Sequence, residues 1–391
     1  MHPGHDSERI ARRLKLLLVA FLALLSIAYL GKGFYFGIFR DGSDTFRRWA
    51  EERFVVRAHL DPRIAAAFAR RGVVYPPWSY FSGLFLFWPP WPQVRAWYAL
   101  VNLACLTWII VFVAWYAREQ SKLDRLLLVL SVTAIAAFCT NLGVGNYGVI
   151  VIALLAGAYR ADEAGRPVLS GLLIGVALLK PQLALPFLLV ALVRERFRAL
   201  AAAATYMIVA TAAIWMISGV DPLRMLEQSV QMAGAFAQTT AGLLTVVLDA
   251  GVPYNVAAPV TAMLCVAISI PLLWFYRNRS PMLLFAIAAL TSRLWTYNLN
   301  TSNLMLVFLL LALWRLAVES NTSDMRATVL YLAVAASLWI PASLSEHHVI
   351  QLGEHLIWLA GIIGLLILDR RVSISDEVEV ADQIHAAAVR R

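Results

Sequence analysis

The stretch that most distinguishes this chain runs from Arg40 to Pro92, and it is polar where almost everything after it is apolar. It opens with Arg40-Asp41-Gly42-Ser43-Asp44 and passes through a segment rich in arginine and acidic residues. It then reaches Tyr75-Pro76-Pro77-Trp78 and closes with Trp88-Pro89-Pro90-Trp91-Pro92. We interpret a polar loop with acidic residues at its start and proline-aromatic motifs at its end as the active-site loop of a membrane enzyme.

The composition around this loop places the chain in a membrane. Of the 391 residues, 61% are hydrophobic, whereas soluble domains are roughly 45–50% apolar. A helix crosses a bilayer with ~20 largely apolar residues, and the sequence contains many such runs. We therefore predict an all-α, polytopic membrane protein, a bundle of about 10–13 transmembrane helices with surface helices on its outer first loop.

Charge distribution gives the expected orientation. Arginines and a lysine precede the first span, residues 16–39, so the positive-inside bias places the N-terminus in the cytoplasm. The net charge of +9 does not indicate nucleic acid, because most basic residues fall in short loops that this orientation also places inside. The first outer loop opposes this bias with seven arginines, which we attribute to contact with anionic lipid or phosphate. They are Arg47, Arg48, Arg53, Arg57, Arg63, Arg70 and Arg71.

Local patterns predict how the loops and broken helices are built. Ser43 or Asp44 is predicted to cap a helix whose apolar side faces the membrane surface, with Arg48, Glu51 and Glu52 on the opposite side. Residues 79–88 are apolar but too short to cross, which indicates a re-entrant or surface helix. Proline removes a backbone donor and clashes with the preceding turn, so residues 168–193 are predicted as two short helices meeting at Lys180.

These spans make one transmembrane domain, residues 1–368, with outer segments at 40–92 and 221–254. A further span is expected over residues 126–142. Residues 369–391 are predicted to form a polar, loosely ordered cytoplasmic tail. The three cysteines lie in apolar runs without paired spacing and are interpreted as packing residues.

Histidine and glutamate cluster near the C-terminus, as Glu346-His347-His348 and Glu354-His355. This spacing matches no helical zinc motif. We therefore interpret the cluster as a solvated loop, and we predict no metal site and no cofactor.

Five motifs, taken in order, resemble a known family. They are Asp44 with Phe46, Tyr75-Pro76-Pro77-Trp78, Gly145-Asn146, Lys180-Pro181-Gln182 and Trp295-Thr296-Tyr297. Over about residues 42–311 the chain resembles glycosyltransferase family 87, the polyprenol-phosphate-mannose-dependent mannosyltransferase-like proteins of the GT-C superfamily. The resemblance implies a GT-C fold, a lipid-phosphate sugar donor and a non-cytoplasmic active site. It also implies that an aspartate of the first outer loop is the base.

The chain departs from the family pattern at two positions. Asn298 and Asn303 stand where family members often carry a histidine and an aspartate. Amides form hydrogen bonds with a sugar or phosphate but do not titrate. The departures therefore leave open a different donor sugar or acceptor, reduced activity, or a membrane protein that has kept the fold and lost the reaction.

The candidate site residues follow from this resemblance and from the residues themselves. Asp44 is the expected base, with Asp41 as the alternative, although an aspartate here also serves as a helix cap. Lys180 is expected to contact the donor phosphate or to snorkel to the interface, and Arg293 to contact phosphate or anchor the interface. The remaining substrate-binding candidates supply amide or aromatic groups: Gln182, Tyr297, Asn298, Asn303, Tyr75, Trp78 and Asn146.

The sequence thus favours an inverting glycosyltransferase that moves a mannose-like hexose from a polyprenyl-phosphate donor to a lipid or glycan acceptor. The alternative is a transporter or flippase of a polyprenyl-linked or other amphipathic lipid, although no internal repeat of the kind found in transporters is present. An alanine- and arginine-rich composition favours a bacterial inner membrane.

Overall fold

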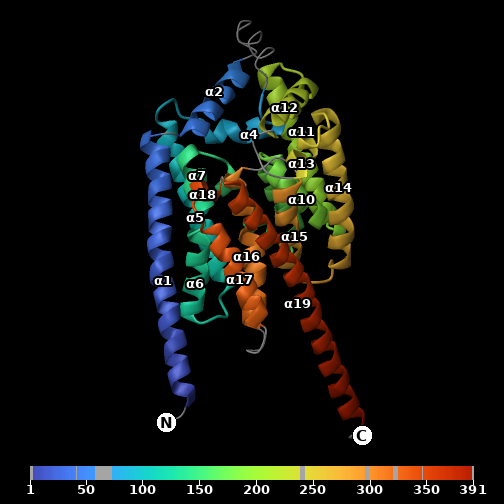
Figure 1. The fold of residues 1–391 in the computed structure, drawn as a ribbon. Coiled ribbons are helices and arrows are strands. Elements are labelled where there is room, and N and C mark those ends of the chain that lie inside the picture. The colour runs from blue at the N-terminus through green and yellow to red at the C-terminus, as the bar shows by residue number, and fades with distance from the viewer. Residues whose placement is uncertain are drawn as a thin grey trace.

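The computed structural model describes residues 3–40, 42–57, 73–237, 243–295, 299–319, 325–345 and 347–389. Within these ranges the regular structure is helical and includes no strand (Figure 1). A helix satisfies its backbone polar groups internally, as a bilayer requires. The predicted all-α polytopic membrane protein is confirmed.

Six helical segments of the described chain are long and apolar enough to cross a membrane. They lie in α1 (Pro3–Tyr35) with the π-helical turn η1 (Phe36–Arg40), α5 (Val94–Tyr116), α11 (Phe197–Ser218), α14 (Tyr254–Phe275), the 3-10 helix η2 (Asn300–Leu306) with α16 (Val307–Glu319), and α19 (His348–Val389). A bent pair, α6 (Lys122–Thr133) and α7 (Ala136–Val144), makes a possible seventh.

Four shorter apolar helices accompany them: α9 (Pro167–Ala177), α10 (Pro181–Val193), α15 (Pro281–Leu294) and α17 (Met325–Leu338). Because their length does not settle whether each crosses, the predicted number of about 10–13 crossings stays a prediction.

The core of the bundle is formed by α8 (Gly148–Glu163), α15, η2 and α16. In the span that contains η2 and α16, 83% of the most apolar 18-residue stretch is buried inside the protein, whereas the corresponding share in the first span is 11%. A helix that is apolar all round and buried belongs to the interior, whereas α1 presents its apolar side chains outward, as expected toward lipid.

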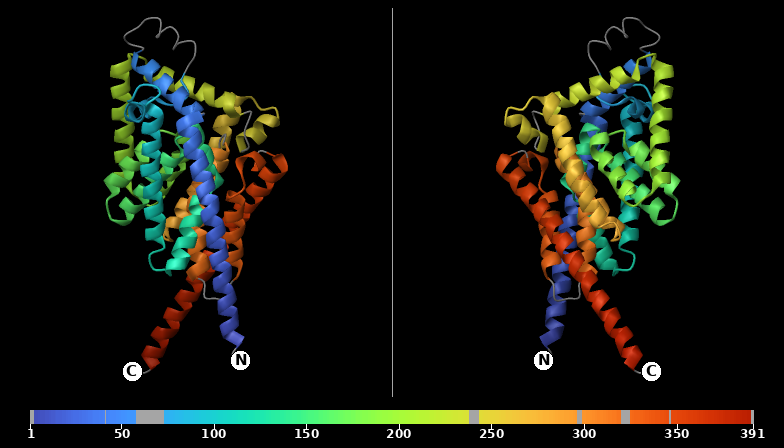
Figure 2. Two further views of the ribbon diagram at one scale, coloured as in Figure 1. Left: turned by 90° about the vertical axis from the view of Figure 1, so that its left-hand side faces the viewer. Right: turned by 90° about the vertical axis from the view of Figure 1, so that its right-hand side faces the viewer.

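The short helices gather at one end of the molecule. Figures 1 and 2 show α2 (Ser43–Arg57), α4 (Pro77–Leu86) and α12 (Pro222–Ala237) at the end opposite to the two termini. Another short helix, α13 (Leu243–Asp249), follows α12. The helices predicted within residues 40–92 are therefore present, and the second outer segment, residues 221–254, also contains helices.

The break at Lys180 is confirmed, because α9 ends at Ala177 and α10 begins at Pro181. The span expected over residues 126–142 corresponds to α6 and α7, which together are long and apolar enough to cross but meet at a 47° bend. One other expectation was wrong. The tail after residue 368 is not loosely ordered, because α19 continues as a helix to Val389.

Candidate functional site

A tight glycine turn places the start of α2 against the bundle. Gly145 ends α7 with φ +80°, a left-handed conformation that favours glycine. A Cβ atom at this position would overlap the Thr45 side chain of α2. The backbone N–H of Gly42 donates to the Gly143 carbonyl at 3.2 Å. The turn therefore lets the first residues of α2 lie directly on the junction of α7 and α8.

Three predicted site residues meet at this junction. The amide nitrogen of Asn146 donates to Asp44 Oδ2 at 3.1 Å. Lys180 Nζ donates to the amide oxygen of Asn146 at 2.7 Å. Tyr98 holds the Asn146 backbone through a hydrogen bond from its hydroxyl to the Asn146 carbonyl, at 3.1 Å. A carboxylate, an amide and an ammonium group from three separate elements thus form one hydrogen-bonded chain.

Lys180 reaches this chain because the span breaks there. It precedes Pro181, the first residue of α10, and its side chain is buried, with 4% of the residue exposed. Among the described residues, Asn146 is the one hydrogen-bond partner of the Lys180 ammonium group, which carries three donors. A buried cation with spare donors is a suitable ligand for an anion.

The α4 helix satisfies the carbonyl groups that the break exposes. Trp78 Nε1 donates to the Leu178 carbonyl and Ser79 Oγ to the Leu179 carbonyl, each at 2.9 Å. A broken helix at membrane depth needs such partners for its free backbone groups. The indole N–H of Trp78, predicted as a sugar or lipid contact, is therefore used to hold the broken span.

Sequence reasoning missed a buried polar network on α2. Arg48 pairs with Glu51 and lies over the ring of Tyr75, with its guanidinium carbon 4.4 Å from the ring centre. Glu51 also accepts hydrogen bonds from the Tyr80 hydroxyl and from the Val74 N–H. This network fixes α2 to the chain entering α4. The Tyr75 ring packs against Tyr147, the residue after Asn146, with the ring centres 5.3 Å apart.

The polar side of α2 packs against the protein. Thr45, Arg48, Glu52 and Val55 form its buried stripe, while Phe46 on the predicted membrane face is 47% exposed. That the apolar side of α2 faces the membrane stays a prediction. The spacing i, i+3, i+7, i+10 does mark one helix face, but its polar members made it look like a solvent face. Two of the outer-loop arginines have protein partners: Arg48 pairs with Glu51, and Arg53 donates to the Trp88 carbonyl at 2.6 Å. Arg63, Arg70 and Arg71 lie outside the described residues.

Glu52 is the least satisfied member of this stripe. Its Oε1 is buried and has no hydrogen-bond partner among the described residues, and its carboxyl group lies against Gly83 of α4. Burial, followed by the neighbouring Glu51, raises the pKa of the Glu52 carboxyl well above its ordinary value. Glu52 therefore favours the protonated state more than an exposed glutamate does.

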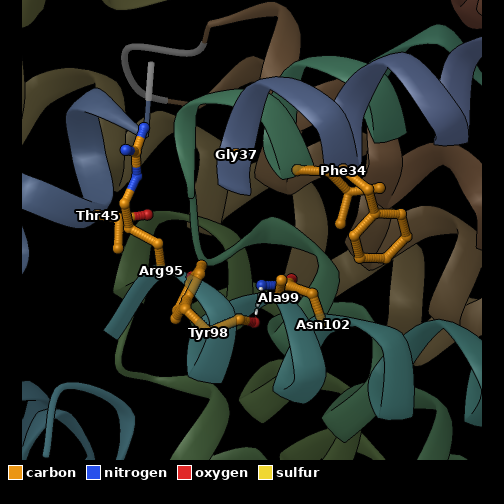
Figure 3. A pocket seen from close by; sticks show the side chains of 8 residues that line it. Phe34, Gly37, Thr45, Arg95, Tyr98, Ala99 and Asn102 are labelled. Carbon is orange, nitrogen blue, oxygen red and sulfur yellow. Dashed lines mark hydrogen bonds between the residues drawn. The ribbon is translucent and has the colours of Figure 1, made fainter. Parts of the chain in front are cut away.

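A small cavity lies beneath the start of α2 (Figure 3). Its volume is about 10 Å³, and Thr45, Arg95, Tyr98 and Asn102 contribute to its walls. The amide nitrogen of Asn102 donates to the Tyr98 carbonyl at 2.9 Å. A cavity of about this size has room for roughly one water molecule, so it is too small for a sugar.

A second buried group joins α15 to η2. Arg293, which is fully buried, donates from Nε to Asn303 Oδ1 at 2.8 Å, and its guanidinium carbon lies 5.4 Å from the Trp358 ring centre. Full burial excludes the predicted role of Arg293 as an interface anchor. Glu354 was predicted in a solvated loop, which was wrong: it is buried on α19 and accepts a hydrogen bond from Ser345 at 2.6 Å.

The hydrogen-bonded chain that includes Lys180 and the pair formed by Arg293 and Asn303 lie at neighbouring helix ends. Trp295, just after α15, donates from Nε1 to the backbone carbonyl of Gln182 at the start of α10, at 2.9 Å. Asn141 of α7 donates to the Thr301 carbonyl of η2 at 2.8 Å. Asp41, Tyr297 and Asn298, also predicted as site residues, lie outside the described residues.

A comparison with protein families places the chain. The model of glycosyltransferase family 87 matches residues 74–297, more than half of the chain. No curated protein matches the chain significantly. The matched region begins just before Tyr75 and includes Asn146, Lys180 and Arg293.

Proposed function

The chain belongs to glycosyltransferase family 87, and on this premise we propose that it is an inverting transferase that uses a polyprenyl-phosphate sugar. A mannose-like hexose is the first sugar to test, and the acceptor is a lipid or glycan. The protein is an integral membrane glycosyltransferase. Its proposed setting is a bacterial inner membrane, with both termini in the cytoplasm and the reaction at the outer face, where α2 and α4 lie.

The observation that carries this proposal is the chain of hydrogen bonds from Asp44 through Asn146 to Lys180. Sugar transfer from a lipid phosphate needs a group that accepts the proton of the acceptor hydroxyl. It also needs a group that stabilises the departing phosphate. The Asp44 carboxylate and the Lys180 ammonium group have these two properties, and Asn146 fixes their separation.

The proposed reaction follows from these positions. The acceptor oxygen forms a bond to the anomeric carbon on the side opposite to the phosphate, and its proton passes to the Asp44 carboxylate. The bond from the anomeric carbon to the phosphate oxygen breaks, and its electron pair stays on the phosphate. General-base catalysis contributes ~10²–10⁴-fold, and a fixed cation in a water-poor site stabilises the developing phosphate charge.

The other candidates take supporting roles in this proposal. Asp41 is the alternative base, and Tyr75, Gln182, Tyr297 and Asn298 are sugar or lipid contacts. Arg293 is a positioning residue that acts through Asn303, because its guanidinium group is fully buried and bonded to that amide.

The first test compares wild type with Asp44→Asn in membranes supplied with radiolabelled polyprenyl-phosphate sugars. The amide keeps the shape of the side chain but takes no proton, so lipid-extractable product should fall at least ~10²-fold. Asp221→Asn is the matched control, because Asp221 is an exposed aspartate that caps α12 at the same end of the molecule.

Each outcome separates the possibilities. Equal product from Asp44→Asn and wild type, at equal expression, would move the base to Asp41 or elsewhere. No product from wild type with any of several donor sugars would contradict the proposed donor class.

A further inference from the structure

A larger polar cavity lies at the other end of the bundle. Its volume is about 250 Å³, and it is lined by the end of α5, the end of α8 and the end of α16. Because α5 has 23 residues, this cavity is about 34 Å from the end of α5 that adjoins the candidate site. The cavity is therefore separate from the proposed reaction, and it lies toward the end that carries both termini (Figure 1).

Arginine side chains gather at this cavity around one tryptophan. The guanidinium carbons of Arg118 and Arg160 lie 4.8 Å and 3.5 Å from the ring centre of Trp115. Of these arginines Arg118 lines the cavity, as does Arg315, which donates to the Ser280 hydroxyl at 2.9 Å. Stacking on an aromatic face leaves the edge of a guanidinium group, which carries its N–H donors, free to bind an anion.

Two glutamates nearby offset part of this charge, and three arginines against two glutamates leave one net positive charge. Glu163 accepts a hydrogen bond from the Tyr159 hydroxyl at 2.9 Å and pairs with Arg160 at 3.4 Å. Glu119 pairs with Arg118 at 3.1 Å, but its side chain is 80% exposed. An exposed pair of this kind contributes little and does not hold the arginine in place.

A buried donor also lines the cavity without an acceptor. Trp314 is 7% exposed, and its Nε1 has no hydrogen-bond partner among the described residues. A buried N–H without an acceptor is unfavourable, and native structures rarely leave one unpaired. An oxygen-bearing ligand in the cavity would supply the missing acceptor.

We propose that this cavity binds a phosphate group, and specifically the headgroup of an anionic phospholipid in the leaflet on the side of the termini. The arginines match the negative charge of the phosphate, and the Trp314 N–H donates to one of its oxygens. Basic pockets between transmembrane helices bind anionic headgroups in this way. The volume of the cavity suits a headgroup, whose acyl chains would continue along the outer helices into the bilayer.

The test uses the full-length protein, delipidated in detergent, and native mass spectrometry to follow the first bound lipid. Phosphatidylglycerol is expected to bind at least tenfold more tightly than phosphatidylcholine with the same acyl chains. Trp314→Phe removes the donor and keeps a ring, and Arg118→Gln removes a charge. Each should weaken phosphatidylglycerol binding roughly tenfold, the size typical of a hydrogen bond to a charged group.

Arg166→Gln is the matched control, since Arg166 is an exposed arginine in the loop after α8 and does not line the cavity. It changes the net charge as Arg118→Gln does and should leave binding unchanged. Equal binding of the two lipids would overturn the proposal. An equal loss in Arg166→Gln and Arg118→Gln would also overturn it, because it would show only general charge attraction.

A competition with glycerol 3-phosphate identifies the source of the phosphate. If millimolar glycerol 3-phosphate leaves the lipid bound, the ligand is a lipid headgroup, as proposed. If it displaces the lipid fully, the site takes a soluble phosphate, which overturns the lipid assignment. Circular dichroism shows whether Trp314→Phe keeps its helices; if it does not, Arg118→Gln decides the outcome.

Discussion

At the scale of single residues, two adjacent glutamates on α2 have opposite surroundings. Glu51 pairs with Arg48 and accepts hydrogen bonds from Tyr80 and from the Val74 N–H. Glu52 is buried against Gly83 and has an oxygen without a partner among the described residues. The same side chain therefore stabilises the fold at one position and opposes it at the next.

This contrast predicts opposite effects of one substitution. Glu51→Gln leaves the buried Arg48 charge uncompensated and should lower the free energy of unfolding by about 3–5 kcal/mol. Glu52→Gln keeps the size of the side chain and removes a carboxyl group that is costly to ionise, so it should be neutral or stabilising at pH 7. Thermal unfolding of both variants in detergent checks this; equal destabilisation would contradict it.

The raised pKa of Glu52 also sets a pH dependence. Folded Glu52 holds its proton more tightly than the unfolded chain does, so its contribution to stability is fully present below its ordinary pKa of 4.5. That contribution is lost as pH rises above this value, at up to about 1.4 kcal/mol per pH unit. The melting temperature of the wild type should therefore fall between pH 5 and pH 8. We expect the share of this fall that is due to Glu52 to be absent in Glu52→Gln.

Lys180 gives a second prediction at this scale. Lys180→Met keeps the length and apolar stem of the side chain but removes the charge, so sugar transfer should fall about 10²–10³-fold while the protein stays folded. Lys180→Arg should retain part of the activity, because it keeps the positive charge. Product formed in membranes from the two variants is the measurement. Full activity of Lys180→Met would remove Lys180 from the phosphate site.

At the scale of elements, the site depends on how closely α2 approaches the turn after α7. Gly145 allows this approach because it has no Cβ and adopts a positive φ. Without that turn, Asp44 would not reach Asn146. The Gly145 turn takes no part in the reaction, but it positions Asp44, the proposed base.

Gly145→Ala should separate α2 from the turn and lower both activity and stability, the latter by about 1–3 kcal/mol. The matched control is Gly251→Ala, because Gly251 has a similar φ of +85° but open space around its Cβ position. It should show the backbone strain alone and keep full activity. If the two variants lose activity equally, contact with Thr45 is not what matters at Gly145.

The break at Lys180 and the bend between α6 and α7 differ in how well the sequence predicts them. The break at Lys180-Pro181 was predicted because proline acts on its own turn. The bend between α6 and α7 has no proline, but Thr133, the last residue of α6, donates from its hydroxyl to the Val129 carbonyl at 3.1 Å. Such back-bonding often bends helices, and a threonine in an apolar run is a weak signal for it.

At the scale of the whole molecule, the polar ends of the bundle face opposite ways. The short helices lie at one end and both termini at the other (Figure 2). The proposed orientation places the first end outside, on the basis of the positive-inside bias.

Cysteine labelling tests this orientation. In a background with Cys105, Cys139 and Cys265 replaced by alanine, Asp221→Cys should react with an impermeant maleimide added to intact cells. Glu119→Cys, in the exposed loop after α5, should react only after the membrane is permeabilised. The reverse pattern would place the termini outside and invert the proposed topology.

Composition and hydrophobic length were enough to predict the membrane class and the all-α bundle, and proline was enough to predict the break at Lys180. These features depend on composition, proline and hydrophobic length, which act locally along the chain. What each helix faces followed only from the packing of the whole molecule. A helical wheel shows which residues share a side, but whether that side meets lipid, water or another helix depends on residues far away in sequence. For this reason the buried polar face of α2, the burial of Glu354 and the meeting of Asp44, Asn146 and Lys180 emerged only from the packed molecule.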